Sequence, residues 1–208
     1  MNDFDDIRPF NDSEVPAALA RLIADSEMMN LLLSRQFPVL TKILPGIFNL
    51  LARPLLRRSL RKLTKNVSTI SDFQHHMTNR LVDVLQKSTE HYAFSGLEGL
   101  DSDRAYLFMS NHRDIALDPA IICLGLTSVG RNTVRIAIGD NLLSKPFASD
   151  LMRVNRSFIV KRSVSGRREK LDALKKLSRY MRHSVSHEEV SIWIAQAEGR
   201  AKDGKDKT

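Results

Sequence analysis

The sequence has one cysteine and few aromatic residues, and these shortages exclude several kinds of protein. Of its 208 residues, one is cysteine, one is tryptophan and 6% are aromatic. One cysteine cannot form an intramolecular disulfide, and zinc sites usually need several cysteine or histidine ligands. Cys123 lies in the apolar run 121–124, which predicts a buried, reduced thiol in a cytosolic protein. No ligand cluster suggests a metal, and we expect no cofactor.

Long apolar runs are also missing. A conventional transmembrane helix needs about 18 uncharged apolar residues, and no such run occurs. The closest candidate, residues 37–56, is interrupted by charged residues, prolines and a glycine. Residues 1–6 are acidic and lack the basic start and apolar stretch of a signal peptide. The sequence therefore predicts a cytoplasmic protein without a conventional membrane span.

Acidic residues are absent between Glu27 and Asp72, although the chain contains 24 of them. This stretch supplies eight of the positive charges in a chain of net charge +8: Arg35, Lys42, Arg53, Arg57, Arg58, Arg61, Lys62 and Lys65. Basic charge of this kind suits either nucleic acid or an anionic membrane surface. Nucleic acid is disfavoured because Phe37 and Phe48 are the only aromatic residues in the stretch that could stack on bases.

Within residues 53–65, basic side chains alternate with leucines. Three interpretations compete: a solvated helix face, packing within a helical region, and a helix that lies in the headgroup plane of a membrane. In the last, leucines face the lipid interior and basic groups face anionic headgroups. We expect an anionic membrane surface as a partner, with the protein peripheral at the cytoplasmic face.

The spacing of apolar residues divides the chain near residue 90. Residues 1–89 show helical periodicity, with a break at Pro45-Gly46 and a capping-box pattern at 71–74. Residues 90–208 alternate short apolar runs with helical segments, as βα units do. We expect strands at 92–95, 105–109, 134–138, 157–160 and 190–194, and helices that begin near Asp118 and cover 145–153 and 167–182.

This order predicts two domains in an α/β fold: a mixed sheet flanked by helices, preceded by a helical region. The helical, membrane-docking region would cover residues 1–89, and the α/β domain would cover 90–208. Residues 199–208 resemble a loop that leads into a further element. We therefore expect either that the C-terminal part of the domain is missing or that the end of the chain is mobile.

His112 lies where the α/β pattern predicts chemistry. It follows the predicted strand 105–109 directly and precedes a predicted helix, so it belongs at the carboxyl end of a strand. Asp114 and Asp118 are close enough in sequence to hydrogen-bond the imidazole. A carboxylate on one ring nitrogen leaves the other nitrogen as a general base. By spacing alone, a structural histidine that caps a turn is the simpler interpretation.

Three segments change that interpretation. Residues 111–119, Asn-His-Arg…Leu-Asp-Pro, resemble the signature of the glycerophospholipid acyltransferase family, whose hallmark is a histidine, four residues and an aspartate. Leu151-Met152-Arg153 with residues 157–163 resembles the second block of the family, an apolar strand that ends in an arginine. Residues 192–200 resemble its third block, a strand followed by Glu-Gly and a nearby arginine. The resemblance covers roughly residues 90 to 204.

The resemblance implies an acyltransferase similar to 1-acylglycerol-3-phosphate O-acyltransferases. The acyl donor would be acyl-CoA or acyl carrier protein, and the acceptor a lysophospholipid or glycerol phosphate. His112 would deprotonate the acceptor hydroxyl, and substrate-binding roles are implied for Asn111, Arg113, Arg162, Glu198, Gly199 and Arg200. Of these, Arg162, Gly199 and Arg200 would bind the acceptor phosphate, since arginine forks and a bare backbone suit an oxyanion. Glu198 would position neighbouring groups.

The sequence also departs from the pattern of the family and suggests a divergent branch. Five residues, rather than four, separate His112 from Asp118, which keeps the Leu-Asp-Pro context and is the first choice as the partner of the histidine. Asp114 is the rival. Arg156 stands where glycine is common, Ala197 where proline is common, and the fourth block is absent. The shifted spacing leaves open an alternative, a non-catalytic lipid-binding or scaffolding module that retains the fold.

Overall fold

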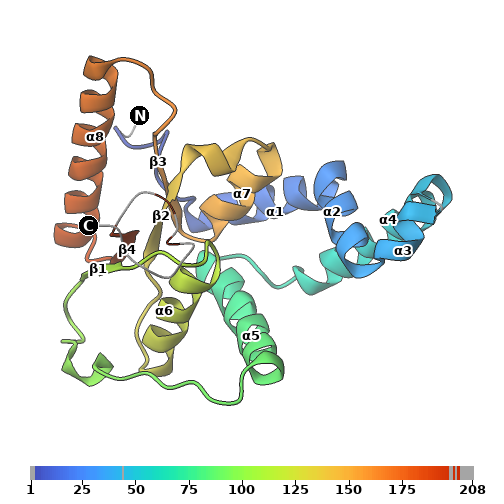
Figure 1. Cartoon of the computed structure of the whole chain (residues 1–208), viewed down its shortest axis with the longest axis horizontal. Coiled ribbons are helices and arrows are strands. Elements are labelled where there is room, and N and C mark those ends of the chain that lie inside the picture. Colours follow the sequence, from blue (N-terminus) through green and yellow to red (C-terminus); the bar gives the residue numbers. More distant parts are fainter. Residues whose placement is uncertain (1–2, 44, 197–198, 200, 202–208) are drawn as a thin grey trace. The chain divides into compact units, whose positions relative to one another are not determined.

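The computed structural model describes residues 3–43, 45–196, 199 and 201 and divides the chain into two compact units. The sheet unit contains the N-terminal residues up to Pro9, Gln74–Asn141 and the residues from Arg156 onward. The helical unit contains Phe10–Phe73 and Leu142–Asn155. The two units interleave along the chain, so the domain boundary at residues 89 and 90 stays a prediction from the sequence. Each unit is described by itself below (Figure 1).

The sheet unit is built on four strands. These are β1 (Leu107–Ser110), β2 (Arg135–Gly139), β3 (Ser157–Val160) and β4 (Ile192–Ala195), in the order β1-β4-β2-β3. Phe158, Ile192 and Trp193 are almost completely buried, as expected for parallel strands covered on both faces. The predicted α/β fold with N-terminal helices is confirmed. Every pair of described strands is parallel, whereas we expected a mixed sheet.

The predicted strand at 92–95 is wrong, because these residues form an irregular segment. The ring of Phe94 lies against Gly125, where a Cβ atom would approach its Cδ1 to 2.9 Å. Gly96 then turns the chain with a φ of 82°. Phe94 therefore packs on a helix instead of pairing with the sheet. The other four strands form within two residues of their predicted positions.

Helices connect these strands. The sheet unit contains most of α5 (Ile70–Ser88), together with η2 (Leu97–Gly99), α6 (Leu117–Ser128) and α8 (Arg167–Ser186). Helix α8 packs on β4. The predicted helices near residues 118 and 167 are therefore confirmed.

The N-terminal residues cover the outer edge of β3. The carbonyl oxygen of Ile7 accepts a hydrogen bond from the backbone N–H of Ile159 at 2.9 Å. Asp6 pairs with Lys161 and Lys176. Burial acts to raise the pKa of Asp6, but the two lysines outweigh it and lower the pKa to about 2. This backbone and ionic contact protects an edge strand that would otherwise present unpaired polar groups.

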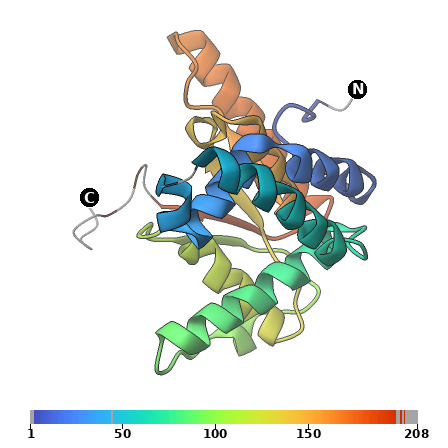
Figure 2. The same ribbon diagram turned by 90° about the vertical axis from the view of Figure 1, so that its right-hand side faces the viewer.

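The helical unit contains η1 (Asp12–Glu14), α1 (Val15–Ala24), α2 (Ser26–Gln36), α3 (Pro38–Ile43), α4 (Pro45–Leu63), the start of α5, the end of η3 (Asp140–Leu143), and α7 (Pro146–Val154). Its core is an apolar cluster: Val15, Ala18, Leu19, Leu22, Val67, Phe73 and Val154. Arg21 on α1 makes two hydrogen bonds of 2.8 Å to Asp150 on α7. Helices α2, α3 and α4 pack on one another, as Figure 2 shows.

Helix boundaries in this unit agree with the turn signals in the sequence. The predicted break at Pro45-Gly46 falls where α4 begins. The capping box of α5 is made by Thr69 and Asp72, which exchange hydrogen bonds of 2.9 and 3.0 Å, rather than by residues 71–74. None of the described helices is long and apolar enough to cross a membrane.

Candidate active site

The parallel strands bring the predicted site residues together at the carboxyl end of the sheet. In a parallel sheet all strands end at the same edge, and ligands bind there. His112 follows β1, Asp140 follows β2, Arg162 follows β3 and Gly199 follows β4. Because β4 lies between β1 and β2, the residues after β4 are the nearest neighbours of the His112 loop.

His112 contacts Asp118 in the loop between β1 and α6. The Nδ1 atom of His112 lies 2.9 Å from Oδ2 of Asp118, and both side chains are 18% exposed. A carboxylate can only accept a hydrogen bond, so the imidazole proton belongs on Nδ1. The Nε2 atom is then left as a base, the arrangement needed to remove a proton from a hydroxyl group.

The loop itself holds Asp118 in place. The same Oδ2 atom accepts hydrogen bonds from the backbone N–H groups of Arg113 at 2.7 Å and Asp114 at 3.0 Å. The chain thus wraps around the carboxylate, and this wrapping accommodates the additional residue between His112 and Asp118. The carboxylate that holds the imidazole is therefore the one in the Leu-Asp-Pro context.

Asp114, the rival partner, serves the start of the helix. Its Oδ1 atom accepts hydrogen bonds from the backbone N–H groups of Ala116 at 2.8 Å and Leu117 at 2.7 Å. The Leu117 N–H belongs to the first turn of α6 and has no partner within the helix, so Asp114 stabilises the turn that leads into α6. Asn111 and Arg113 are exposed in the same loop.

The segment after β4 closes on the His112 loop. The backbone N–H of Gln196 donates to the carbonyl oxygen of Ser110 at 2.9 Å, and that of Ala201 donates to the carbonyl oxygen of His112 at 2.8 Å. Gly199 has a φ of 83°, a conformation that favours glycine. Glu198 and Arg200, to which the resemblance assigned substrate-binding roles, lie outside the described residues.

The comparison with protein families agrees with this arrangement. The model of the family described as Acyltransferase, the phospholipid and glycerol acyltransferases, matches residues 91–206, more than half of the chain. The chain belongs to this acyltransferase family. The family supports a general acyltransferase activity for the chain. A search of curated proteins found no match.

Two residues that were not among the predicted site residues, Asp140 and Gly139, position Arg162, the arginine of the second block. Asp140, after β2, accepts hydrogen bonds of 3.1 Å from the backbone N–H groups of Arg162 and Ser163 and from the Ser163 hydroxyl. Burial acts to raise the pKa of Asp140, but these hydrogen bonds outweigh it and lower the pKa. Asp140, in its ionised carboxylate form, therefore holds the loop after β3 in place.

Gly139 provides the space that the Arg162 side chain occupies. A Cβ atom at Gly139 would lie 3.3 Å from both Cδ and Nε of Arg162 and would clash with Asn141. The arginine side chain thus lies over the end of β2, one strand closer to His112 than its own strand. A polar residue directly after a predicted strand was the available sequence signal for Asp140.

Cys123 has the properties of a structural residue within this family fold. It is buried in α6, as predicted, and burial raises the pKa of its thiol. A protonated, buried thiol is a poor nucleophile. Among residues 3–43, 45–196, 199 and 201, no group of three or more histidine, cysteine, aspartate or glutamate side chains could hold a metal ion.

Proposed function

We propose that this acyltransferase moves a fatty acyl group from the thioester of acyl-CoA or acyl carrier protein to a hydroxyl of a glycerophosphate-type lipid, with His112 as the general base. The observation that carries the proposal is the 2.9 Å contact between His112 Nδ1 and Asp118. It leaves Nε2 as the base at the carboxyl end of β1, within a domain of the acyltransferase family.

The reaction then needs one base and no covalent enzyme intermediate. Nε2 of His112 takes the proton of the acceptor hydroxyl while the hydroxyl oxygen attacks the carbonyl carbon of the thioester. Collapse of the tetrahedral intermediate breaks the C–S bond, and the leaving thiolate takes the proton from the imidazolium. Asp118 maintains the tautomer and stabilises the transient positive charge. Direct attack is favoured because the Cys123 thiol is buried and its pKa is raised.

The acceptor phosphate is proposed to bind Arg162, Gly199 and Arg200. Strands β1 and β3 are three strand spacings apart, about 14 Å at ~4.8 Å per strand. The Arg162 side chain shortens that separation by lying over Gly139. Arginine binds phosphate in a bidentate manner, so its placement decides how well the acceptor is held.

Asp140 is expected to control binding of the acceptor through this loop. Asp140→Ala removes all three hydrogen bonds to residues 162 and 163, and we expect a rise of about tenfold in the KM for a phosphate-bearing acceptor with an unchanged KM for the thioester. Asp140→Asn retains the acceptor oxygen and should have a smaller effect. Steady-state kinetics with each substrate varied would measure both values. Asp103→Ala, in the exposed loop before β1, is the control; an unchanged acceptor KM in Asp140→Ala would contradict the assignment.

The alternative function, a non-catalytic module, was suggested by the additional residue between His112 and Asp118. In the folded loop the additional residue does not separate the pair, because the backbone of residues 113 and 114 wraps around the carboxylate. That reason for the alternative is therefore removed, and acyl transfer is the function we propose.

We further propose that the helical unit docks at an anionic membrane surface and that the protein is peripheral at the cytoplasmic face of that membrane. The support is an apolar surface on α2, α3 and α4, here called the apolar patch: Leu31, Val39, Leu40, Ile43, Leu50, Leu51 and Leu55. Leu50 is 74% exposed and Leu55 is 69% exposed. Exposed apolar side chains grouped on helices that pack on one another are typical of interaction sites.

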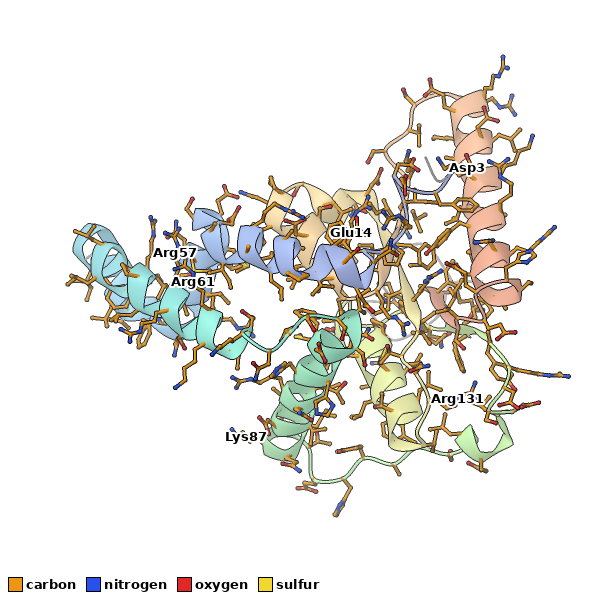
Figure 3. The ribbon with its side chains drawn as sticks, turned by 180° about the vertical axis from the view of Figure 1, so that it is seen from behind. Asp3, Glu14, Arg57, Arg61, Lys87 and Arg131 are labelled. Carbon is orange, nitrogen blue, oxygen red and sulfur yellow. The ribbon has the colours of Figure 1, made fainter. Side chains whose placement is uncertain are left out.

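The basic residues of α4 divide into two groups. Arg53 donates hydrogen bonds to Asn30, and Arg57 donates to the carbonyl oxygen of Ala24 at 2.8 Å, so these two arginines hold α4 against its neighbours. Arg58, Arg61 and Lys62 on α4, and Lys65 shortly after its end, are exposed. Figure 3 labels Arg57 and Arg61 on this helix. The exposed basic group lies C-terminal to the exposed leucines, so side chains suited to lipid and to anionic headgroups are neighbours along this segment.

Flotation with vesicles tests this docking. Wild-type protein is expected to float with vesicles that contain anionic lipid and to do so less well as salt is raised, because exposed charges are screened. Leu50→Glu with Leu55→Glu should abolish flotation, and Arg61→Glu with Lys62→Glu should weaken it on anionic vesicles. Leu171→Glu with Leu174→Glu, at two leucines of α8 that are 51% and 57% exposed, is the matched control. Failure of the wild type to bind anionic vesicles at any salt concentration would refute docking.

A further inference from the structure

Trp193, the single tryptophan of the chain, lies against the proposed base. It is on β4, opposite Phe108 of β1, and is 2% exposed. The centroids of the His112 and Trp193 rings are 6.0 Å apart, and the ring planes meet at 67°. Aromatic rings attract each other in this edge-to-face arrangement. The imidazole therefore has a carboxylate at one edge and an indole beside it.

The indole is itself fixed by a hydrogen bond. Its Nε1–H donates to Oγ of Ser110 at 3.0 Å, and the Ser110 hydroxyl donates to the carbonyl oxygen of Asn111 at 3.1 Å. Ser110 thus uses both its acceptor and its donor capacity, and it links the carboxyl end of β1 to the indole. His112 follows Ser110 by two residues, so the same hydroxyl joins the strand, the loop and the aromatic ring beside the base.

We propose that Trp193 and Ser110 are positioning residues for the His112 base, a proposal that rests on the proposed acyl-transfer function. Asp118 sets which nitrogen carries the proton, but one hydrogen bond leaves the imidazole able to swing about it. The anchored indole removes that freedom and keeps Nε2 directed to where the acceptor hydroxyl must lie. A base held in a productive orientation gains rate because a small misplacement of the reacting atoms is costly.

The kinetic test uses Ser110 first, because its replacement changes little volume. Ser110→Ala removes the anchor of the indole and is expected to lower kcat about tenfold, with KM for both substrates unchanged. Ser110→Thr keeps the hydroxyl and should restore kcat. Trp193→Leu removes the ring and is expected to lower kcat about 100-fold. Phe158→Leu, at a fully buried ring of β3 that packs on Tyr180, is the control for lost aromatic packing in the same sheet.

The single tryptophan also provides a direct optical readout. A protonated imidazole in contact with an indole quenches its fluorescence, so the emission of the whole chain should fall as His112 is protonated. Other charged groups lie close to the imidazole: Asp118 contacts it, and Arg113 and Asp114 are in the same loop. His112→Gln leaves these groups in place, so it must abolish the change in fluorescence if His112 is the cause. In Ser110→Ala the amplitude of quenching should be smaller.

The outcomes separate this proposal from the proposed function. If His112→Ala is inactive while Ser110→Ala and Trp193→Leu retain the kcat of the wild type, acyl transfer stands and positioning by the indole is wrong. If His112→Ala is active, the proposed function itself fails. Equal losses of kcat in Phe158→Leu and Trp193→Leu would also overturn positioning, because general packing would then explain both. If Trp193→Leu does not fold, the kcat of Ser110→Ala and the quenching measurement still test the positioning role.

Discussion

Replacement of His112 by alanine is expected to lower kcat about 1000-fold and leave the fold intact. The large loss follows because the substitution removes the only proposed base, and positioned proton transfer contributes 10²- to 10⁴-fold to a rate. The fold should survive because the imidazole is partly exposed, in a loop after the carboxyl end of β1. The measurement is acyl transfer to lysophospholipid and glycerol phosphate acceptors with acyl-CoA and acyl carrier protein donors, beside thermal unfolding of each variant.

A histidine elsewhere in the chain supplies the control for this experiment. His76 is exposed on α5, so His76→Ala changes the same residue type without touching the site. We expect wild-type kcat for this variant with every donor and acceptor. Full turnover by His112→Ala would remove His112 from the mechanism, and the pattern of active substrates in the wild type would identify the donor and acceptor classes.

Replacing each of the two loop aspartates separately should distinguish an effect on catalysis from an effect on stability. Asp118→Asn is expected to lower kcat by 10² or more, because an amide can donate to Nδ1 and shift the imidazole proton to Nε2. Asp114→Ala instead removes two hydrogen bonds at the start of α6, and we expect a loss of about 1 kcal/mol in the free energy of unfolding. Its kcat should fall far less than that of Asp118→Asn.

Kinetics and denaturant unfolding of both variants would decide between the carboxylates. The hydrogen bonds predict a crossed result: Asp118→Asn loses activity, and Asp114→Ala loses stability. The opposite result, with activity lost on changing Asp114, would mean that Asp114 orients the base. Asp101→Asn, in the turn before β1, serves as a further control because its side chain accepts from the backbone of Asp103 within that turn.

The spacing of apolar residues predicted many of the strands and helices, because these elements depend mainly on residues that are close in sequence. Strands β2, β3 and β4 follow from short apolar runs, and α6, α7 and α8 follow from helical spacing, with ends within a few residues. The segment 92–95 shows the limit of this reasoning. A short apolar run predicts burial, but it does not show whether a sheet or a helix buries it, and here Gly125 of α6 accepts the Phe94 ring.

The basic segment shows a different limit. If residues 53–65 formed a simple solvated helix face, the arginines would point outward and the leucines would point toward the protein. In α4, Arg53 and Arg57 instead reach inward to polar groups of α1 and α2, while Leu50 and Leu55 face outward. The acceptors are the side-chain oxygen of Asn30 and the backbone carbonyl of Ala24, and both come within reach of the long arginine side chains only when the helices are packed.

By itself, the sequence determined that this chain is an α/β acyltransferase with a histidine at the carboxyl end of its first strand. Those conclusions need only neighbouring residues and a recognisable order of segments. Tertiary structure alone decided that Asp118 rather than Asp114 holds the imidazole, that Asp140 orders the Arg162 loop, and that Trp193 lies beside the base. The physical reason is that hydrogen bonds and ring contacts depend on direction and strand order, whereas spacing in sequence supplies only candidates.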